Sequence, residues 1–404
     1  MLKRNKIIIS NNIIFLLLLM IITVSVKAEG DIYVQFFSNI LQNLNVDGSS
    51  GNYIFRFYLA GSLLLAIMIG PFADTYNKRT IFIFGLVFYT IISFSCLYFI
   101  NHNFKILLIA RFLQGMAQGV ITVVGWLLLF DNFSIIESGK MSGLVKGTSA
   151  LLLAFTPLFS LWISNLYGWH SSFSITPILA IIALIISIFF LPKSPPKDNK
   201  TGFRLSKILK DYLKVLKNFE CFTYILISAF VSSTYIVFLS NASIIFISNN
   251  YITKENFSYF ITANSLTYII ASFCSIYIID KKGIDFTKNI GFIVFITGSS
   301  SLFISSILDA ENIIAILSSF IVMSIGSALM TGFILKAVHV FPEMKGISMS
   351  VHYIFTAIIS ARKLLWSQVF FNSKITPTTT IIFCGTLIIS TLFIAVQYNK
   401  SKTS

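Results

Sequence analysis

The sequence predicts an all-α membrane protein with twelve transmembrane helices, arranged as two six-helix bundles that form a pseudo-repeat. Three observations lead to this fold class. Hydrophobic residues make up 56% of the chain and charged residues only 11%, whereas soluble domains average about 25% charged residues. Apolar runs of about 20 residues, the length that crosses a bilayer as a helix, recur throughout. A basic, proline-containing stretch divides these runs into six and six.

Each predicted span corresponds to one apolar run, and no soluble domain of any size remains between the runs. In chain order the spans are expected at residues 10–41, 53–72, 80–100, 105–129, 141–164, 171–191, 220–247, 256–279, 289–308, 312–338, 346–371 and 378–398. The expected domains are an N-terminal bundle, a basic cytoplasmic linker and a C-terminal bundle, over residues 1–191, 192–219 and 220–404. Within the linker, residues 211–217 fit either an amphipathic helix on the inner surface, held by acidic lipids, or a solvated segment.

The net charge of +15 is distributed as in a membrane protein rather than in a nucleic-acid-binding protein. Basic residues gather in the segments expected to be cytoplasmic, whereas the outer loops contain only Lys105, Lys254 and Lys374. This bias predicts a multi-pass protein of a bacterial inner membrane with both termini in the cytoplasm. Residues 3–28 also imitate a cleaved signal peptide. Cleavage would reverse the charge bias, so we expect this segment to stay as the first span.

The sequence contains no pattern typical of an enzyme, a metal site or a cofactor site. All four cysteines lie in apolar runs and no Cys-x-x-Cys pair occurs, which argues against structural disulfides and a cysteine metal site. The histidines are scattered, at His102, His170, His339 and His352. We therefore expect a protein without cofactors that acts as a monomer on a small-molecule substrate.

One short loop carries the most specific motif. Between the second and third spans the chain reads Gly70-Pro-Phe-Ala-Asp74-Thr-Tyr-Asn-Lys78-Arg79. This loop resembles the signature loop of the major facilitator superfamily, Gly-x-Leu-Ala-Asp-Arg-x-Gly-Arg-Lys. Thr75 and Asn77 replace the usual arginine and glycine. Because Asn tolerates left-handed backbone better than most residues, we expect the turn to survive.

Two further segments strengthen the resemblance. Arg111-Phe-Leu-Gln114-Gly115 resembles the fourth-span motif of the superfamily, and Gly115 and Gly119 suit close helix packing. The segment from Glu29 to Tyr33 resembles the acidic first span of drug/proton antiporters of the bicyclomycin-resistance and MdfA-like type. The resemblance covers essentially the whole chain and implies a carrier that works by alternating access.

The resemblance also implies an inner gate, formed by Gly70, Asp74, Lys78, Arg79 and Asp131. Asp74 is expected to cap the N-terminus of the eleventh span, where a carboxylate is favoured. Lys78 or Arg79 is expected to pair with Asp131 at the inner end of the fourth span. The alternative is a loop that sets topology and has no gating role.

Charged residues inside a span are costly and mark functional sites. Only two acids lie well inside a predicted span, Glu29 and Asp31, so both are candidates for proton coupling. Lys27 and Asp31 share one helix face, and Glu29 points about 200° away from them. Arg111 lies about 9 Å inside the fourth span at 1.5 Å per residue. We therefore prefer Asp31 as the proton site, with Lys27 or Arg111 as its counter-charge. Alternatively, the first span ends at Val26 and these charges lie in a solvated loop.

The function predicted from these features is proton-coupled efflux of lipophilic or cationic small molecules. Arg111, Lys27 and Trp126 are the expected cavity residues, although Trp126 fits plain packing equally well. An uptake permease for a small metabolite is the main alternative. It is favoured by Lys27 beside Asp31 and by a fifth-span antiporter motif that retains its proline but not its glycines, at Leu152, Thr156, Pro157, Ser160 and Leu161. A non-transporting membrane protein is the second alternative.

Overall fold

A computed structural model describes residues 2–51, 53–191, 205–248, 252–308, 312–369 and 376–403. Nearly all of these residues are helical, and the described part of the chain contains no β-strand. The predicted all-α fold class is therefore confirmed. Contacts between residues divide the chain into two compact units. Unit 1 comprises residues 1–132 and 148–205, and unit 2 comprises residues 133–147 and 206–404.

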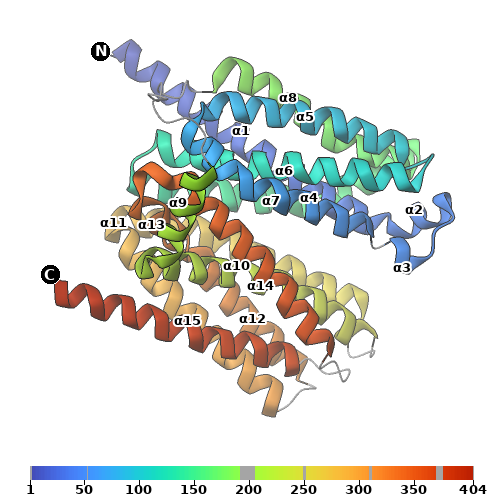
Figure 1. The fold of residues 1–404 in the computed structure, drawn as a ribbon. Helices are drawn as coiled ribbons and strands as arrows, with labels where there is room; N and C mark the ends of the chain where they lie inside the picture. The colour runs from blue at the N-terminus through green and yellow to red at the C-terminus, as the bar shows by residue number, and fades with distance from the viewer. Residues whose placement is uncertain are drawn as a thin grey trace. The chain divides into compact units, whose positions relative to one another are not determined.

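The first half of the chain contains helices α1 (Leu2–Gln35), α2 (Phe37–Leu44), α3 (Gly48–Gly51), α4 (Tyr53–Thr75), α5 (Lys78–Phe99), α6 (Phe104–Asn132), α7 (Ile135–Tyr167), η1 (Trp169–Ser174) and α8 (Ile175–Phe190). The second half contains α9 (Leu205–Lys217), α10 (Phe219–Ser248), α11 (Lys254–Leu308), α12 (Ile313–Leu329), α13 (Gly332–Val340), η2 (Pro342–Met344), α14 (Lys345–Val369) and α15 (Thr376–Thr403) (Figure 1). The first turns of α7 belong to unit 2, which the predicted division at residues 191 and 219 did not anticipate.

Helices lie at each predicted span, but not every one passes a test of length and hydropathy. Among the described residues, eight helices are long and apolar enough to cross a membrane. The number rises to nine if α9 and the first part of α10, which are bent by 81°, form one span. Several apolar helices therefore support a multi-pass membrane protein, and the count of twelve spans stays a prediction.

Helices α4 and α6 pack closely in unit 1 because glycines remove side chains from their contact (Figure 1). A Cβ atom on Gly115 would overlap the carbonyl oxygen of Tyr58, and one on Gly119 would lie 2.6 Å from the carbonyl oxygen of Ser62. A Cβ atom on Gly61 would likewise overlap the carbonyl oxygen of Phe112. The close packing predicted at Gly115 and Gly119 is confirmed, and it fixes the position of Arg111 one turn earlier on α6.

The turn between α4 and α5 survives for a different reason from the one we predicted. Asn77 has φ −67° and ψ 112°, which is extended rather than left-handed backbone. Its side-chain oxygen accepts hydrogen bonds from the backbone N–H groups of Arg79 at 3.0 Å and Thr80 at 3.3 Å. Asn77 is thus the N-cap of α5. Thr75, which replaces the usual arginine, donates from its hydroxyl to the carbonyl oxygen of Pro71 at 2.8 Å.

In unit 2, the eighth and ninth predicted spans meet without a loop. Helix α11 is interrupted only at Gly283, which has φ 83° and ψ 171°. Glycine adopts such a backbone without steric strain. Just after this break, a carboxylate oxygen of Asp285 lies 2.8 Å from Nζ of Lys336 on α13, and the other oxygen lies 3.1 Å from Nζ of Lys288. This arrangement, the Asp285 clamp, joins the restart of α11 to α13.

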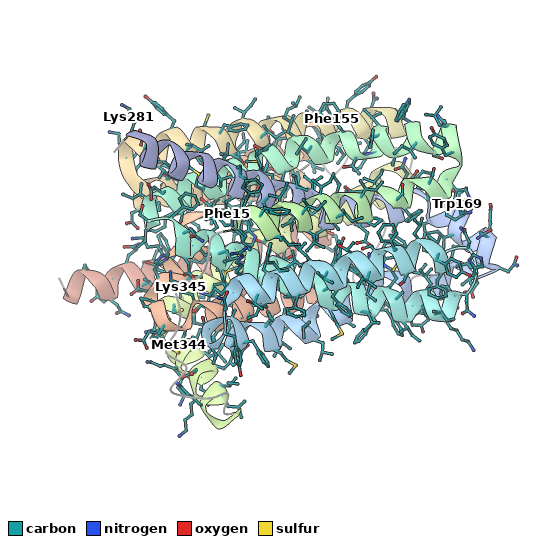
Figure 2. The ribbon with its side chains drawn as sticks, turned by 90° about the horizontal axis from the view of Figure 1, so that it is seen from above. Phe15, Phe155, Trp169, Lys281, Met344 and Lys345 are labelled. Carbon is teal, nitrogen blue, oxygen red and sulfur yellow. The ribbon has the colours of Figure 1, made fainter. Side chains whose placement is uncertain are left out.

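The connecting segments of unit 2 that were expected to be cytoplasmic lie together. Figure 2 shows Lys281, Met344 and Lys345 at one end of the unit. At the same connection Lys140, from the first turns of α7, forms an ion pair with Asp280. This grouping puts the helix ends near Gly283 and η2 at the same end of unit 2.

Candidate functional site

The centre of the candidate site is Glu29, which lies inside unit 1 although it is an acid within an apolar helix. Helix α1 continues past Val26 to Gln35, so the alternative in which Lys27–Asp31 form a solvated loop is wrong. Only 2% of the Glu29 surface is exposed. A carboxylate buried to this extent needs a cation or hydrogen-bond donors, because desolvation of the charge is costly.

Arg111 of α6 supplies the cation. Its guanidinium forms an ion pair with Glu29, and the Arg111 surface is 1% exposed. Of the two counter-charges expected for Asp31, Lys27 or Arg111, Arg111 pairs instead with Glu29. Glu29 does point away from Lys27 and Asp31, as the helical spacing predicted. Arg111 meets Glu29 and not Asp31 because α6 packs against the Glu29 side of α1.

Neutral polar side chains complete the network around the ion pair. The Tyr89 hydroxyl donates to the second carboxylate oxygen of Glu29 at 2.7 Å. Arg111 Nη1 donates to Gln114 Oε1 at 2.8 Å. Gln114 Nε2 in turn donates to Ser93 Oγ at 2.8 Å. Helices α1, α5 and α6 are thus joined through one buried set of polar groups, which we call the Glu29 network: Glu29, Tyr89, Ser93, Arg111 and Gln114.

Sequence reasoning missed Tyr89, Ser93 and Gln114 as partners of Glu29. Gln114 was visible as part of the fourth-span motif, three residues after Arg111 and therefore on the same helix face. Tyr89 and Ser93 are themselves four residues apart, which makes a short polar stripe on an otherwise apolar helix. A search for such stripes in the apolar runs would have found both residues.

Lys27 and Asp31 lie on the opposite face of α1 from Glu29. Both side chains are exposed. They are one turn apart, and each charge favours the other. The structure therefore separates the charges of α1 into a buried acid that pairs with Arg111 and an exposed acid that is balanced on its own helix.

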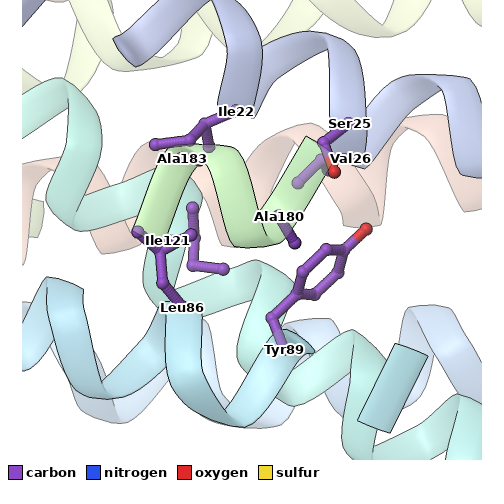
Figure 3. Close-up of a pocket in the computed structure, with 8 residues that line it drawn as sticks. All are labelled: Ile22, Ser25, Val26, Leu86, Tyr89, Ile121, Ala180 and Ala183. Atoms are coloured by element: carbon purple, nitrogen blue, oxygen red, sulfur yellow. The ribbon is translucent and has the colours of Figure 1, made fainter. Parts of the chain in front are cut away.

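A narrow crevice lies next to the Glu29 network. Figure 3 shows its lining residues, which come from α1, α5, α6 and α8 and are Ile22, Ser25, Val26, Leu86, Tyr89, Ile121, Ala180 and Ala183. The lining is apolar apart from the Ser25 and Tyr89 hydroxyls, and the crevice is too tight for a water molecule. It therefore isolates the Tyr89 side of Glu29 from solvent and does not form a substrate pocket.

Trp126, the third expected cavity residue, is half-buried on α6, with its ring centroid 6.0 Å from that of Phe130. This contact is within the range of ordinary aromatic packing. A role of Trp126, Lys27 or Arg111 in substrate binding stays a prediction.

The residues of the expected inner gate are ordered around the turn between α4 and α5. Lys78 is only 4% exposed and forms an ion pair with Asp131, so this predicted pairing is present. Arg79 instead donates from Nη2 to the carbonyl oxygen of Ile188 at 2.7 Å. Gly70 is buried within α4, and Asp74 is half-buried in its last turn. Capping of the eleventh span by Asp74, and gating itself, stay predictions.

The chemistry available to the Glu29 network is proton binding. Glu29 can exist as a carboxylate paired with Arg111 or as a neutral acid, while Arg111 stays protonated at any physiological pH. No group of His, Cys, Asp or Glu within the described residues is arranged to hold a metal ion. The network therefore offers a site at which a proton can bind.

Comparison with known proteins identifies related sequences. Residues 13–362 match the family model described as Major Facilitator Superfamily. The chain is 24% identical over 298 residues to the bicyclomycin resistance protein homolog of Haemophilus influenzae, covering 73% of this chain and 74% of that protein. It is 22% identical over 317 residues to the chloramphenicol resistance protein CraA of Acinetobacter baumannii, covering 78% and 76%.

Solved structures share the fold at low sequence identity. A bacterial homologue of the iron transporter ferroportin, in an outward-facing state, has a TM-score of 0.74 at 10% identity, covering 94% of this chain and 98% of that chain. The transporter FucP, in an outward conformation, has a TM-score of 0.71 at 12% identity, covering 95% and 98%. These likenesses concern the fold alone.

Proposed function

This chain belongs to the Major Facilitator Superfamily, and from that membership we propose that it is a proton-coupled antiporter that exports lipophilic or cationic small molecules by alternating access. The observation that carries the proposal is the buried carboxylate of Glu29 on α1, which forms an ion pair with Arg111 on α6. A carrier driven by protons needs one acid that gains and loses a proton as access alternates. The protein is a transporter and not an enzyme.

In the proposed cycle, Glu29 binds a proton from the outer side and releases it to the cytoplasm. The neutral acid no longer balances Arg111, so the two protonation states favour different packing of α1 against α6. Substrate binding is coupled to this difference. Lys27 and Asp31 border the water-filled path, because exposed charges on a spanning helix do not face lipid. Asp31 thereby stays a second candidate for proton coupling.

Export is favoured over uptake by what the similar proteins are called. Two relatives are named for resistance to bicyclomycin and chloramphenicol, and other relatives are named as the multidrug resistance proteins MdtL and MdtM. A resistance protein with this architecture removes the drug from the cell. The permease alternative has no comparable support.

The test of this function is substrate-induced proton movement in everted membrane vesicles. The protein is produced in a bacterium that lacks its own efflux pumps, and the vesicles are acidified inside by respiration. Addition of chloramphenicol or bicyclomycin is expected to release protons from the lumen, because export from the cell corresponds to uptake into the vesicle. Vesicles without the protein are the control. Absence of proton release, together with energy-dependent accumulation of a metabolite by intact cells, would favour the permease.

We further propose that the protein is a monomer of the bacterial inner membrane with both termini in the cytoplasm, and that its linker helix α9 binds acidic lipids. The bend of 81° between α9 and the first part of α10 lays α9 along the membrane surface when α10 spans the bilayer. Val215 packs α9 onto the core of unit 2 and is fully buried. Leu209 and Leu213 are 58% and 52% exposed beside the lysine-rich face of α9. Apolar and basic faces side by side suit the headgroup boundary.

Replacing the lysines of α9 with glutamine should remove the dependence of transport on acidic lipid. The residues are Lys207, Lys210, Lys214 and Lys217. Each lysine near an anionic surface contributes about 1 kcal/mol to binding. In proteoliposomes, the wild type is expected to transport faster with phosphatidylglycerol than in neutral lipid, and high salt should reduce the difference. The variant should show no difference, whereas a Lys281→Gln/Lys282→Gln control should behave as wild type. Equal lipid dependence in both variants would contradict the proposal.

A further inference from the structure

The guanidinium of Arg111 lies between two tyrosine rings. Its Cζ atom is 3.9 Å from the ring centroid of Tyr33 on α1 and 4.2 Å from that of Tyr58 on α4. Tyr33 is fully buried, and it follows Glu29 by one helical turn. Tyr33 also packs edge-on against Phe173, with 4.8 Å between ring centroids. Tyr58 is half-buried, and both rings lie directly against the guanidinium.

Proton binding at Glu29 creates an electrostatic problem that these rings address. Among the described residues, Glu29 is the carboxylate that pairs with Arg111. When Glu29 becomes neutral, the buried guanidinium keeps its charge and loses its counter-ion, which is strongly unfavourable in a membrane interior. Gln114 supplies one acceptor, and Arg111 Nε has no hydrogen-bond partner within the described part of the chain. The ring faces are the remaining source of negative potential beside the cation.

We propose that Tyr33 and Tyr58 are positioning residues that stabilise the charged guanidinium of Arg111 while Glu29 is neutral. They thereby set the pH at which the coupling proton binds to Glu29. The inference rests on the proposed function, in which Glu29 carries the proton. The rings contribute more when Glu29 is neutral, because the charge of the guanidinium is then unbalanced. Their loss therefore disfavours the neutral acid, and the coupling proton binds only at lower pH.

The other titratable groups near Glu29 do not offer a second cation that the rings could act on. From α5 the titratable neighbours are Tyr89, bonded to Glu29, and Cys96, whose thiol donates to Gln114. Helix α8, which packs on α1, contains no titratable residue. In η1, His170 packs against Trp169. Lys27 and Asp31 are on the opposite face of α1. Arg111 is the cation joined to Glu29, and the two rings act on it directly.

The test measures protonation of Glu29 itself. The purified protein is titrated by infrared spectroscopy, and the carboxylic acid band of Glu29 is identified by its absence in Glu29→Gln. Tyr33→Leu and Tyr58→Leu are each expected to shift the midpoint of this band to lower pH by about half a unit to one unit. Tyr33→Phe and Tyr58→Phe, which retain the ring faces, should keep the wild-type midpoint.

Should a leucine variant fail to fold, fluorinated phenylalanines at position 58 provide a graded series that keeps the size of the ring. Each added fluorine weakens the negative face of the ring, so the midpoint should fall stepwise. An unchanged midpoint in the leucine or fluorinated variants, or an equal shift in the phenylalanine variants, overturns the proposal. Because the band is read without transport, a shifted midpoint with no substrate-induced proton release would reject the proposed function and keep the role of the rings.

Discussion

Replacement of Glu29 by glutamine is expected to abolish substrate-induced proton release and drug resistance while the protein stays folded. Glutamine has the shape of the neutral acid: its Oε1 can accept a hydrogen bond from Arg111, and its Nε2 can donate one to the Tyr89 hydroxyl oxygen, at the places where the two oxygens of Glu29 accept in the structure. It cannot gain or lose a proton. In everted vesicles the proton signal should fall to the level of membranes without the protein. Thermal unfolding of the purified variant checks that the fold is retained.

Asp31→Asn is the matched control for this variant. Asp31 is exposed and balanced by Lys27, and neither residue belongs to the Glu29 network. We expect proton release to persist in Asp31→Asn, with a change in the substrate concentration that is required. If Asp31→Asn loses proton release and Glu29→Gln retains it, the coupling site is Asp31, as the sequence pattern alone favoured.

Removal of the Asp131 carboxylate is expected to have the second large effect. Lys78 is 4% exposed, and Asp131 is its ion-pair partner. Loss of one member of a fully buried pair costs about 3–5 kcal/mol. Because Asp131 is exposed and only Lys78 is buried, we expect a cost between this value and the ~0–1 kcal/mol of a surface pair. Asp131→Ala should therefore lower the thermal unfolding temperature markedly and reduce drug resistance in cells. Asp131→Asn, which keeps the shape but not the charge, should fall between alanine and wild type.

Two further variants distinguish the role of the ion pair in transport from its role in stability. In Lys78→Met/Asp131→Leu both charges are absent, so the stability of the fold should largely return. Transport should remain impaired if the ion pair gates the inner side. Full transport by this apolar pair would contradict a gating role and leave the pair with a structural role only. Arg79, which bonds the end of α8 instead, serves as a control as Arg79→Gln.

The Lys78–Asp131 pair and the Glu29 network show how far the sequence predicts this site. Lys78 and Asp131 were paired correctly, because the motif fixes a turn of a few residues and the helix lengths bring the two ends together. Helical spacing also separated Glu29 from Lys27 and Asp31 correctly. The choice of the acid that meets Arg111 depends on which side of α1 packs against α6. That packing is set by residues on several helices, and the spacing of residues along α1 alone does not predict it.

The turn at Asn77 and the break at Gly283 also show what the sequence predicts and what it does not. The sequence indicated a chain reversal at both places, from short polar segments between apolar runs. At Asn77 the side chain, rather than an unusual backbone angle, begins the next helix. At Gly283 a single residue with positive φ replaces a loop. Both solutions satisfy the backbone locally, and a count of apolar residues does not distinguish between them.

The Asp285 clamp and the Lys78–Asp131 pair differ in their orientation relative to helix dipoles. Lys78 is the first residue of α5 and Asp131 lies in the last turn of α6, so each charge opposes the dipole of its own helix. Asp285 lies in the first turn of the second part of α11, where a carboxylate is favoured, whereas Lys336 lies in the middle of α13. Each such placement changes stability by about 0.3–1 kcal/mol. The helix dipoles consequently weaken the pair in unit 1, and the exchange Lys78→Asp/Asp131→Lys should raise the unfolding temperature above that of wild type. We propose that a contact that would be stronger with its two side chains exchanged suits an inner gate, because such a gate has to open during transport.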